Sequence, residues 1–425
     1  MSRSLLSYEE AANLVCGYAE QARQLKPAVE RVELARAQGR ILARPVHADR
    51  DQPPFARSTR DGFACRAREA SLHTPLTIAG STRAGLPPGG PLPVGAAWEI
   101  MTGAPIPAGA DAVMMLEHVE SGVGTVRLLP PRVLRSGENI VAQGAQANAG
   151  DELLPAGVSM GAGQIALAAS CGFGSLDVYV RPRVAILSTG DELVPVDREP
   201  DAGQIRNSSG PMLAAMVAAT GGDPWVLAAA ADRDDALDGA IAEAANADLL
   251  LVTGGVSAGK FDLVEPALAR ADAALHFTGV RIQPGKPLVF GEMPRQSGNG
   301  RRSQHGRDVL PIFGLPGNPV SSAVTFLLFA APVLVALTGS NDTAPRFALA
   351  RLGAMPERLA KTGLTRFLPA RCTFGRQAAQ LPEVSPVPWQ GSGDLVALAR
   401  SNCFLVLPED GPAPEPGAVV RILLS

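Results

Sequence analysis

Between Val184 and Thr338, short apolar stretches alternate regularly with helix-like stretches, and this alternation constrains the fold more than any other feature of the chain. Stretches such as VAILS, ADLLLVTGG and VLPIFGL are predicted to be strands because they are short, apolar and bounded by turn residues. Helical stretches, for example PMLAAMVAAT and DDALDGAIAEAA, separate them. The alternation predicts a doubly wound α/β domain built on an essentially parallel, buried sheet.

The rest of the chain follows other patterns. Ser7–Glu10 forms a capping box and opens an N-terminal helix. From about Asp51 to Gly150, short β-like stretches broken by Pro and Gly predict an inserted, mostly-β module, and beyond Gly339 alternating stretches predict a small C-terminal β-barrel or sandwich. The sequence thus predicts a multidomain protein with four segments: an N-terminal helical and linker domain (1–50 plus 146–180), an inserted β domain (51–145), the α/β domain (181–338) and a C-terminal β-barrel domain (339–425).

Composition excludes several classes of function. A chain of 425 residues with a formal net charge of -3 has no basic excess with which to bind nucleic-acid phosphates. Its five cysteines lack C-x-x-C spacing and its five histidines are scattered, so the sequence indicates neither a disulfide framework, nor a zinc site, nor a nucleophilic triad. The first fifteen residues carry glutamates where a signal peptide needs an apolar stretch, which favours a cytoplasmic location.

One uncharged stretch, between Asp308 and Asp342, has to be considered as a membrane span. Pro316, Gly317 and Pro319 would break a spanning helix early. We therefore predict a buried helix of a soluble domain and no membrane partner.

Three loops that follow predicted strands carry glycine and polar residues: STGDE (188–192), TGGVSAG (253–259) and LPGNPVSS (315–322). In open α/β sheets ligands bind where strands end and helices begin, and glycine lets backbone N–H groups approach an anion. Each loop alone is also compatible with a simple tight turn.

Charged residues accompany these loops. Asp191, Glu192 and Asp262 are hard ligands that suit Mg²⁺ bridged to a phosphate, and Asp232 either joins them or caps a helix. Lys286 stands in the stiff turn QPGKP, where a fixed cation indicates a binding site. The chain has neither a Walker A motif nor a dinucleotide-binding fingerprint, so we do not expect a P-loop ATPase or a nicotinamide dehydrogenase.

Seven sequence blocks follow one another along the chain: PPFARSTRDGFA (53–64), EIMTGAPIPAGADAV (99–113), SGENI (136–140), STGDEL (188–193), GGVSAGKFD (254–262), PGKP (284–287) and LPGNPVSS (315–322). Together they resemble the blocks of the molybdopterin molybdenumtransferases, the bacterial MoeA proteins, whose relatives are the gephyrin and plant Cnx E domains. The resemblance covers nearly the whole chain and rests on the order of the blocks. It implies transfer of molybdenum from molybdate to the dithiolene sulfurs of adenylated molybdopterin, with release of AMP and a requirement for Mg²⁺.

The resemblance also implies the site residues, with Glu192 and Asp262 as the metal ligands. The residues expected to take part in catalysis are Asp61, Thr102, Glu192, Asp232, Asp262 and Lys286. The residues expected to bind adenylated molybdopterin or molybdate are Thr189, Asp191, Gly254, Gly255, Ser257, Gln283, Pro287, Asn318, Ser321, Arg371 and Ser392.

The chain departs from the family pattern at four places. RDGFA replaces the usual MDGYA, and Gln283 replaces the first lysine of KPGKP, which removes a positive charge. Where the family often has Phe-x-Arg, this chain has Phe367-Leu-Pro369; Arg371 would face the same side of a strand as Pro369 and is expected to substitute. The loop 295–308 is longer than the family needs. Molybdate and tungstate therefore both stay open as the oxoanion.

Two other functions remain open at this point. The α/β domain alone resembles the related molybdopterin adenylyltransferase, and a gephyrin-like cofactor carrier or scaffold would need no catalysis. The family also implies a homodimer in which Asp61 and Thr102 of one subunit complete the site of the other. The resemblance also implies molybdopterin adenylyltransferase and molybdoenzymes as protein partners.

Overall fold

The computed structural model describes residues 5–256, 263–295, 308–342, 344–355, 363–375, 380–410 and 412–425. The chain divides into two compact units. Unit 1 comprises Met1–Ala43, Gly157–Gly161 and Ser175–Ser425, and unit 2 comprises Arg44–Ala156 and Ala162–Gly174. The predicted α/β and C-terminal segments both fall within unit 1.

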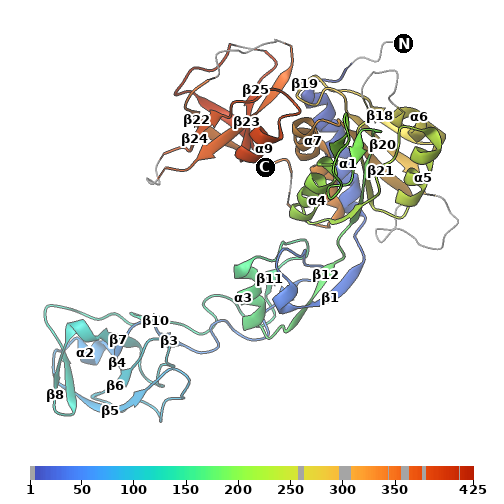
Figure 1. The fold of residues 1–425 in the computed structure, drawn as a ribbon. Coiled ribbons are helices and arrows are strands. Elements are labelled where there is room, and N and C mark those ends of the chain that lie inside the picture. The colour runs from blue at the N-terminus through green and yellow to red at the C-terminus, as the bar shows by residue number, and fades with distance from the viewer. Residues whose placement is uncertain are drawn as a thin grey trace. The chain divides into compact units, whose positions relative to one another are not determined.

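Unit 1 is built around a six-stranded sheet (Figure 1). Four neighbouring strands run parallel, and the last two alternate in direction. The sheet is therefore parallel where its strands are most deeply buried, as the sequence predicts. In spatial order the strands are β16 (Asp223–Val226), β13 (Arg183–Ser188), β17 (Leu249–Thr253), β21 (Val309–Leu315), β20 (Val289–Pro294) and β18 (Ala274–Phe277).

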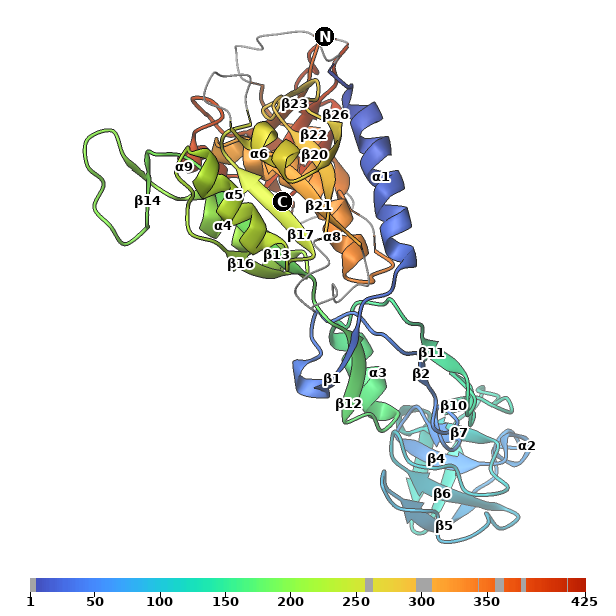
Figure 2. The ribbon, with the colours of Figure 1, turned by 90° about the vertical axis from the view of Figure 1, so that its right-hand side faces the viewer.

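Helices cover both faces of this sheet, because alternate residues of each strand point to opposite sides. Ile186 and Leu251 belong to a core that includes α1 (Tyr8–Gln24), α4 (Ser209–Ala219) and the long C-terminal helix of the domain. Their neighbours Leu187 and Val252 belong to a second core with α5 (Asp234–Ala244) and α6 (Val264–Arg270). Figure 2 shows α1 and α5 on opposite sides of strands β17 and β21. The doubly wound α/β prediction is confirmed.

The uncharged stretch forms one continuous helix in three parts, α7 (Pro319–Thr325), a π-helical turn η3 (Phe326–Ala330) and α8 (Ala331–Leu337). It has a mean hydropathy of 2.3, and among the described residues it alone is long and apolar enough to cross a membrane. However, 89% of it is buried inside the protein. It is a core helix of unit 1, as predicted.

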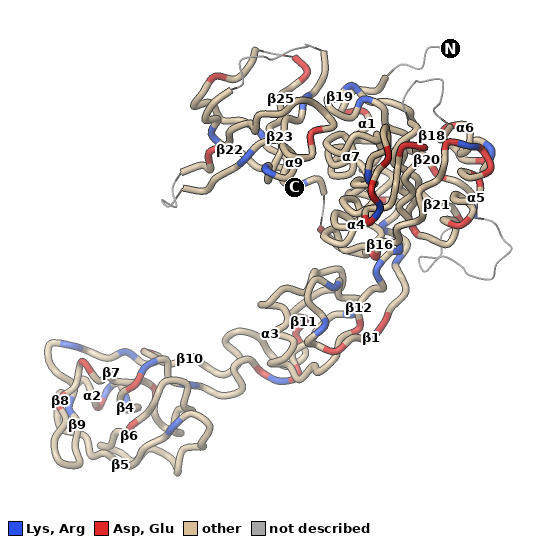
Figure 3. Tube along the Cα trace, viewed as in Figure 1, with Lys and Arg blue, Asp and Glu red and all other residues tan. Residues whose placement is uncertain are grey.

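The charged residues lie elsewhere (Figure 3). Acidic and basic residues occur together on helices α5 and α6. There the Arg270 guanidinium lies 2.9 Å from the Asp234 carboxylate and 2.8 Å from the Asp238 carboxylate. The N-terminus of α1 carries the predicted capping box, formed by Ser7 and Glu10. In it, Glu10 N–H donates to Ser7 Oγ at 3.1 Å.

The C-terminal part of unit 1 is a barrel. Five strands close on themselves because β23 pairs with both β24 and β25. A sixth, two-residue strand from the α/β region, β19, joins the edge of β23 in parallel. The prediction of a small C-terminal β-barrel is confirmed. Its strands are β19 (Ile282–Gln283), β22 (Phe347–Leu352), β23 (Thr365–Thr373), β24 (Glu383–Pro386), β25 (Cys403–Leu407) and β26 (Val419–Leu424), and α9 (Leu395–Arg400) precedes β25.

The short elements of unit 1 outside the sheet and barrel form two strand pairs and a turn. They are β1 (Val29–Glu33) with β12 (Ser175–Tyr179), β14 (Leu193–Val194) with β15 (Ile205–Arg206), and the 3-10 turn η1 (Leu34–Arg36).

Unit 2 is mostly β, as predicted, and its main sheet has six strands with small apolar cores on either side. In spatial order these are β7 (Ala112–Met115), β4 (Gly62–Cys65), β6 (Ala96–Ile100), β5 (Leu76–Thr82), β9 (Thr125–Leu128) and β8 (Val119–Gly122). The remaining elements are the pairs β3 (Arg57–Ser58) with β10 (Ile140–Val141) and β2 (Val46–His47) with β11 (Glu152–Leu154), and the helices α2 (Ala67–Ala70), η2 (Leu116–His118) and α3 (Ala162–Ser170).

Candidate functional site

A cleft of about 1120 Å³ lies at the carboxyl edge of the parallel strands in unit 1. Strands β13, β17 and β21 end at Ser188, Thr253 and Leu315, and the loops that follow them supply much of the lining. The sheet order reverses direction between β13 and β17, because β16 lies on one side of β13 and β17 on the other. Open α/β sheets bind ligands at such switch points. A loop of the barrel and the turn around Lys286 complete the walls.

Most of the predicted site residues meet in this cleft, although they are spread over about 200 positions of the chain. The predicted residues that line it are Thr189, Glu192, Asp232, Gly254, Gly255, Gln283, Lys286, Pro287, Asn318, Ser321 and Ser392.

Backbone hydrogen bonds tie the three strand-end loops together. Thr189 N–H donates to Thr253 O at 2.9 Å, and Gly254 N–H donates to Leu315 O at 3.2 Å. Gly254 has φ +99°, and a Cβ atom there would lie 2.5 Å from the Thr189 carbonyl oxygen. Only glycine allows this close approach without strain. The glycines of TGGVSAG therefore serve the packing of the loops, and this packing exposes their backbone to the cleft.

The loop LPGNPVSS places one of its two serines in the cleft. Asn318 precedes the helix without a side-chain capping bond, and Pro319 occupies the first turn. Ser322 donates its hydroxyl to Pro316 O and is fully buried, so it holds the turn together. Ser321 is only 4% exposed and lines the cleft. Ser321, the serine predicted to bind the substrate, therefore lies in the cleft lining, whereas Ser322 does not.

Two buried polar atoms at the cleft have no hydrogen-bond partner among the described residues, the Thr189 hydroxyl and the Gln283 side-chain oxygen. Thr189 is 5% exposed. Leaving a buried polar atom unpaired costs about 1–3 kcal/mol, so buried groups are normally satisfied by protein, water or ligand. Both atoms are therefore available to a bound ligand. Gln283 stands where the resemblance leads us to expect a lysine.

Four charged residues line the cleft, two carboxylates and two cations: Glu192, Asp232, Lys286 and Arg206. Asp191 stays outside the lining, where its carboxylate accepts the Asp232 N–H at 3.0 Å and ties the two acidic loops together. Lys286 is exposed to the cleft and makes no ion pair with any residue that the structure describes.

The carboxylates of the cleft can be compared with the ligands that the predicted Mg²⁺ ion requires. Within the described ranges no group of three or more His, Cys, Asp or Glu is arranged to hold a metal ion. Mg²⁺ is usually held by only one or two carboxylates together with waters and substrate phosphates. Glu192 and Asp232 satisfy that smaller requirement, so the residues fit a Mg²⁺ ion that binds jointly with a phosphorylated ligand. The second predicted metal ligand, Asp262, lies outside the described residues, as does Ser257.

Arg371, like Asp191, is a predicted substrate-binding residue that does not line the cleft. It is exposed on β23, and its guanidinium donates to Arg400 O at 3.4 Å. The end of β23 near the cleft is its start, where Arg366 pairs in register with Gln283. Arg371 lies five residues further along, about 16 Å at the usual rise of a strand. The prediction considered which face of the strand Arg371 occupies and missed its position along the strand.

Asp61 and Thr102 form a second cluster, in unit 2. Asp61 precedes β4 and Thr102 follows β6, and the pairing of these strands brings the two residues together. The Asp61 carboxylate accepts the Thr102 backbone N–H at 2.6 Å and the Thr102 hydroxyl at 2.9 Å. These two hydrogen bonds, the backbone one first, hold the pKa of Asp61 below its ordinary value. The two residues predicted from separate sequence blocks thus form one charge-stabilised pair.

Sequence reasoning missed many of the residues that line the cleft, among them Arg206, Asn207 and Trp389. Arg206 and Asn207 precede helix α4, in an RNSSGP stretch whose polar residues were available as a helix-start signal. Asn207 is structural in part, since its side-chain oxygen accepts Gly210 N–H at 3.0 Å. Trp389 lines the cleft from the barrel, and its position in a Pro-rich stretch gave no signal of its own.

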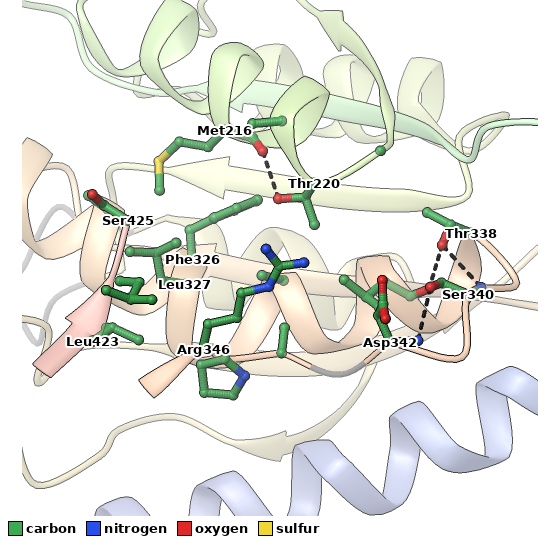
Figure 4. A pocket seen from close by; sticks show the side chains of 18 of the residues that line it. Met216, Thr220, Phe326, Leu327, Thr338, Ser340, Asp342, Arg346, Leu423 and Ser425 are labelled. Carbon is green, nitrogen blue, oxygen red and sulfur yellow. Dashed lines mark hydrogen bonds between the residues drawn. The ribbon is translucent and has the colours of Figure 1, made fainter. Parts of the chain in front are cut away.

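A second cavity, of about 630 Å³, lies between α4, the long helix and the C-terminal strand (Figure 4). Its walls are mainly apolar, with Met216, Phe326, Leu327 and Leu423 among them, and Arg346 extends among these side chains. None of the predicted site residues lines it. The chemistry expected of the site therefore belongs to the cleft at the sheet edge.

Three family models match the chain in succession. "MoeA N-terminal region (domain I and II)" matches residues 6–172, "Probable molybdopterin binding domain" matches residues 185–336, and "MoeA C-terminal region (domain IV)" matches residues 353–425. The last two matches contain the cleft loops, nearly all of the six-stranded sheet and four of the five strands of the closed barrel.

Individual proteins agree with these matches. A molybdopterin molybdenumtransferase of Nostoc sp. is 38% identical over 317 residues, covering 73% of this chain and 70% of that protein. A molybdopterin molybdenumtransferase of Bacillus subtilis is 33% identical over 432 residues, covering 99% of this chain and 94% of that protein. The crystal structure of the molybdopterin biosynthesis MoeA protein from Pyrococcus horikoshii superposes with a TM-score of 0.77 at 27% identity, covering 99% of this chain and 100% of the other.

Proposed function

Because the chain belongs to the MoeA family, we propose that it is a molybdopterin molybdenumtransferase of molybdenum cofactor biosynthesis. It transfers molybdenum from molybdate to the dithiolene sulfurs of adenylated molybdopterin and releases AMP. The observation that carries this proposal is the cleft at the sheet edge, where loops from several distant parts of the chain bring polar, acidic and basic residues together. A cytoplasmic location, predicted from the sequence, remains part of the proposal.

The oxoanion would bind where Lys286, Ser321 and Ser392 face the cleft. Molybdate is a compact dianion, and hydrogen bonds from a cation and from hydroxyls to a charged acceptor are short and strong. Lys286 is not neutralised by any described carboxylate, so its charge is available to such a ligand. Ser392 is fixed in place because its carbonyl oxygen accepts Val320 N–H at 3.0 Å. These residues form a small anion pocket between the long helix and the barrel.

The phosphate groups of the adenylated substrate would bind across the strand-end loops. Gly254 and Gly255 bring backbone to the cleft surface, and the unpaired Thr189 hydroxyl can donate to a phosphate oxygen. Glu192 and Asp232, with Asp262, are the residues that would hold Mg²⁺, which neutralises charge on phosphate oxygens when bound. Arg206 adds a second cation to the same cleft and helps to balance the charge of the phosphates.

The proposal extends to a homodimer in which the Asp61–Thr102 pair of one subunit completes the cleft of the other. The hydrogen bonds of Asp61 are already formed within the single chain, so the carboxylate is oriented and ionised before any partner binds. An ionised, fixed carboxylate can orient a water molecule or a metal-bound group. This is the role proposed for Asp61 in the cleft of the other subunit.

The function is tested with purified protein, adenylated molybdopterin, molybdate and Mg²⁺. We expect release of one AMP per substrate and a product that activates a molybdenum-free molybdoenzyme. A parallel reaction with tungstate measures which oxoanion is preferred. Substrate that binds but releases no AMP with either oxoanion would contradict the proposal.

A further inference from the structure

Trp389 is the one aromatic residue among the residues that line the cleft in the described part of the chain. The other lining residues are glycines, prolines, small polar residues, four charged residues and a few aliphatic ones. Trp389 is half-buried, so part of its apolar ring faces this otherwise mostly polar cleft.

The position of Trp389 is fixed from both sides. Before it, Val387 N–H donates to Pro369 O at 2.8 Å, and after it Gln390 N–H donates to the Asp394 carboxylate at 3.0 Å. The indole packs against the core of the barrel and also against the core that contains the long helix. The backbone on both sides of Trp389 is thus held in place and its ring is packed on two cores, which lowers the entropy cost of using it as a binding surface.

The polar edge of the indole is not used within the protein. Trp389 Nε1 forms no hydrogen bond with any residue that the structure describes, whereas Trp98 Nε1 donates to Thr82 Oγ1 at 2.7 Å. Buried or half-buried indole N–H groups normally find an acceptor. Trp389 therefore offers both an apolar ring surface and an unused donor to a ligand.

We propose that Trp389 is the stacking platform for the pterin ring of the substrate, a positioning role that rests on the proposed function. Ser392, in the proposed anion pocket, is three residues away, so the two Cα atoms are at most about 11 Å apart. In adenylated molybdopterin the dithiolene that receives molybdenum belongs to the pterin half, while the adenine lies beyond the phosphates. A pterin stacked on Trp389 would present its dithiolene toward the anion pocket and its phosphates toward the strand-end loops.

The test compares Trp389→Ala and Trp389→Phe with the wild-type protein by isothermal titration calorimetry. Three probes separate the parts of the substrate: a 6-hydroxymethylpterin monophosphate, inorganic pyrophosphate and AMP. Stacking of a base on an aromatic side chain typically changes affinity by about 5- to 150-fold. We expect Trp389→Ala to weaken binding of the pterin monophosphate by such a factor, Trp389→Phe to restore most of it, and the affinity for pyrophosphate to stay within twofold.

The matched control is Trp225→Phe. Trp225 is also half-buried, but it lies on β16 beneath the Arg183 guanidinium, 3.8 Å from the ring centroid, and does not line the cleft. Pterin binding should be unchanged in this variant. Thermal unfolding of both position-389 variants measures any loss of barrel stability separately from binding.

Several results would overturn the inference. They are unchanged pterin affinity in Trp389→Ala, an equal loss for all three probes, a loss for AMP alone, which would place adenine on the indole, and no pterin binding by the wild type. These outcomes concern ring binding and do not depend on turnover. A protein that binds pterin through Trp389 yet releases no AMP would instead contradict the proposed function.

Discussion

At the scale of single residues, Asp61 shows how a short contact fixes a charge. Its carboxylate is exposed, yet two hydrogen bonds from Thr102 stabilise its ionised form and lower its pKa. An acid whose pKa is lower in the folded state than in the unfolded state stabilises the fold. For Asp61 this contribution is fully present at pH values above its ordinary pKa of 3.8, and it is lost as the pH falls through the folded-state pKa. The pair should therefore be intact throughout the neutral range and weaken only in acid.

Thr102→Val should raise the pKa of Asp61 only in part. The substitution removes the hydroxyl donor but keeps the backbone N–H, which is the larger cause of the lowered pKa. Carboxyl ¹³C chemical shifts followed through a pH titration measure the change. Asp51 is the internal control, because its pKa is lowered by Ala149 N–H and Gln143 instead. An Asp61 pKa that does not move would show that the hydroxyl contributes nothing.

Lys286→Met should slow AMP release by roughly 10- to 100-fold. A hydrogen bond to a charged group is worth about 1.5–3 kcal/mol, and the variant keeps the length of the side chain but loses the charge. The measurement is the initial rate at saturating adenylated molybdopterin and varied molybdate. Lys26→Met is the matched control, since Lys26 is exposed and outside the cleft. Equal rates in the two variants would remove Lys286 from the proposed anion pocket.

At the scale of secondary structure elements, the loops after β13, β17 and β21 depend on their glycines. Gly254→Ala would place a Cβ 2.5 Å from the Thr189 carbonyl oxygen at a φ of +99°. We expect a loss of about 1–3 kcal/mol in the free energy of unfolding, together with loss of activity. Urea titration followed by fluorescence in a Trp98→Phe background reports on unit 1, which contains Trp225 and Trp389.

Gly239→Ala gives the opposite expectation at a matched position. Gly239 lies inside α5, and a Cβ atom there would meet nothing within 4 Å. Alanine should stabilise this helix by about 0.5–1 kcal/mol because glycine loses more conformational freedom on folding. Two glycine-to-alanine changes of opposite sign would show that the effect at Gly254 comes from its conformation and neighbours. The same sign at both positions would contradict that explanation.

The elements also show how far the sequence predicts this protein. Strand and helix periodicity predicted the doubly wound sheet and the buried helix behind Pro319, because these depend on local apolar spacing. Closure of the barrel by β23 and β25 could not be chosen over a sandwich, since it depends on pairing between distant strands. The position of Arg371 relative to the cleft could not be predicted for a related reason. The alternation of residues indicates which face of a strand a side chain occupies, but only the pairing of β19 with β23 shows which end of β23 lies at the cleft.

At the scale of the whole molecule, the proposed shared site predicts complementation between inactive subunits. Asp61→Ala and Lys286→Met change different parts of the proposed site, so each homodimer should release AMP far more slowly than the wild type. A mixed dimer would contain one site with both changes and one with neither. Equal mixing after unfolding and refolding should restore about a quarter of wild-type AMP release, half of the dimers being mixed and half of their sites intact. Mixing each variant with itself is the control, and no recovery in verified mixed dimers would exclude a shared site.

The attachment of the barrel has a consequence for how such proteins can recombine. Residues 282–283 lie within the α/β segment of the sequence yet complete the edge of β23, and the carbonyl of Ser392 is the acceptor for Val320 at the start of the long helix. Dividing the chain after Thr338, at the apparent domain boundary, would therefore separate the strands and the hydrogen-bonding groups that make these two contacts. We therefore expect chimaeras between relatives to be functional only when the PGKP turn and the barrel come from the same parent. The two segments would then be inherited together.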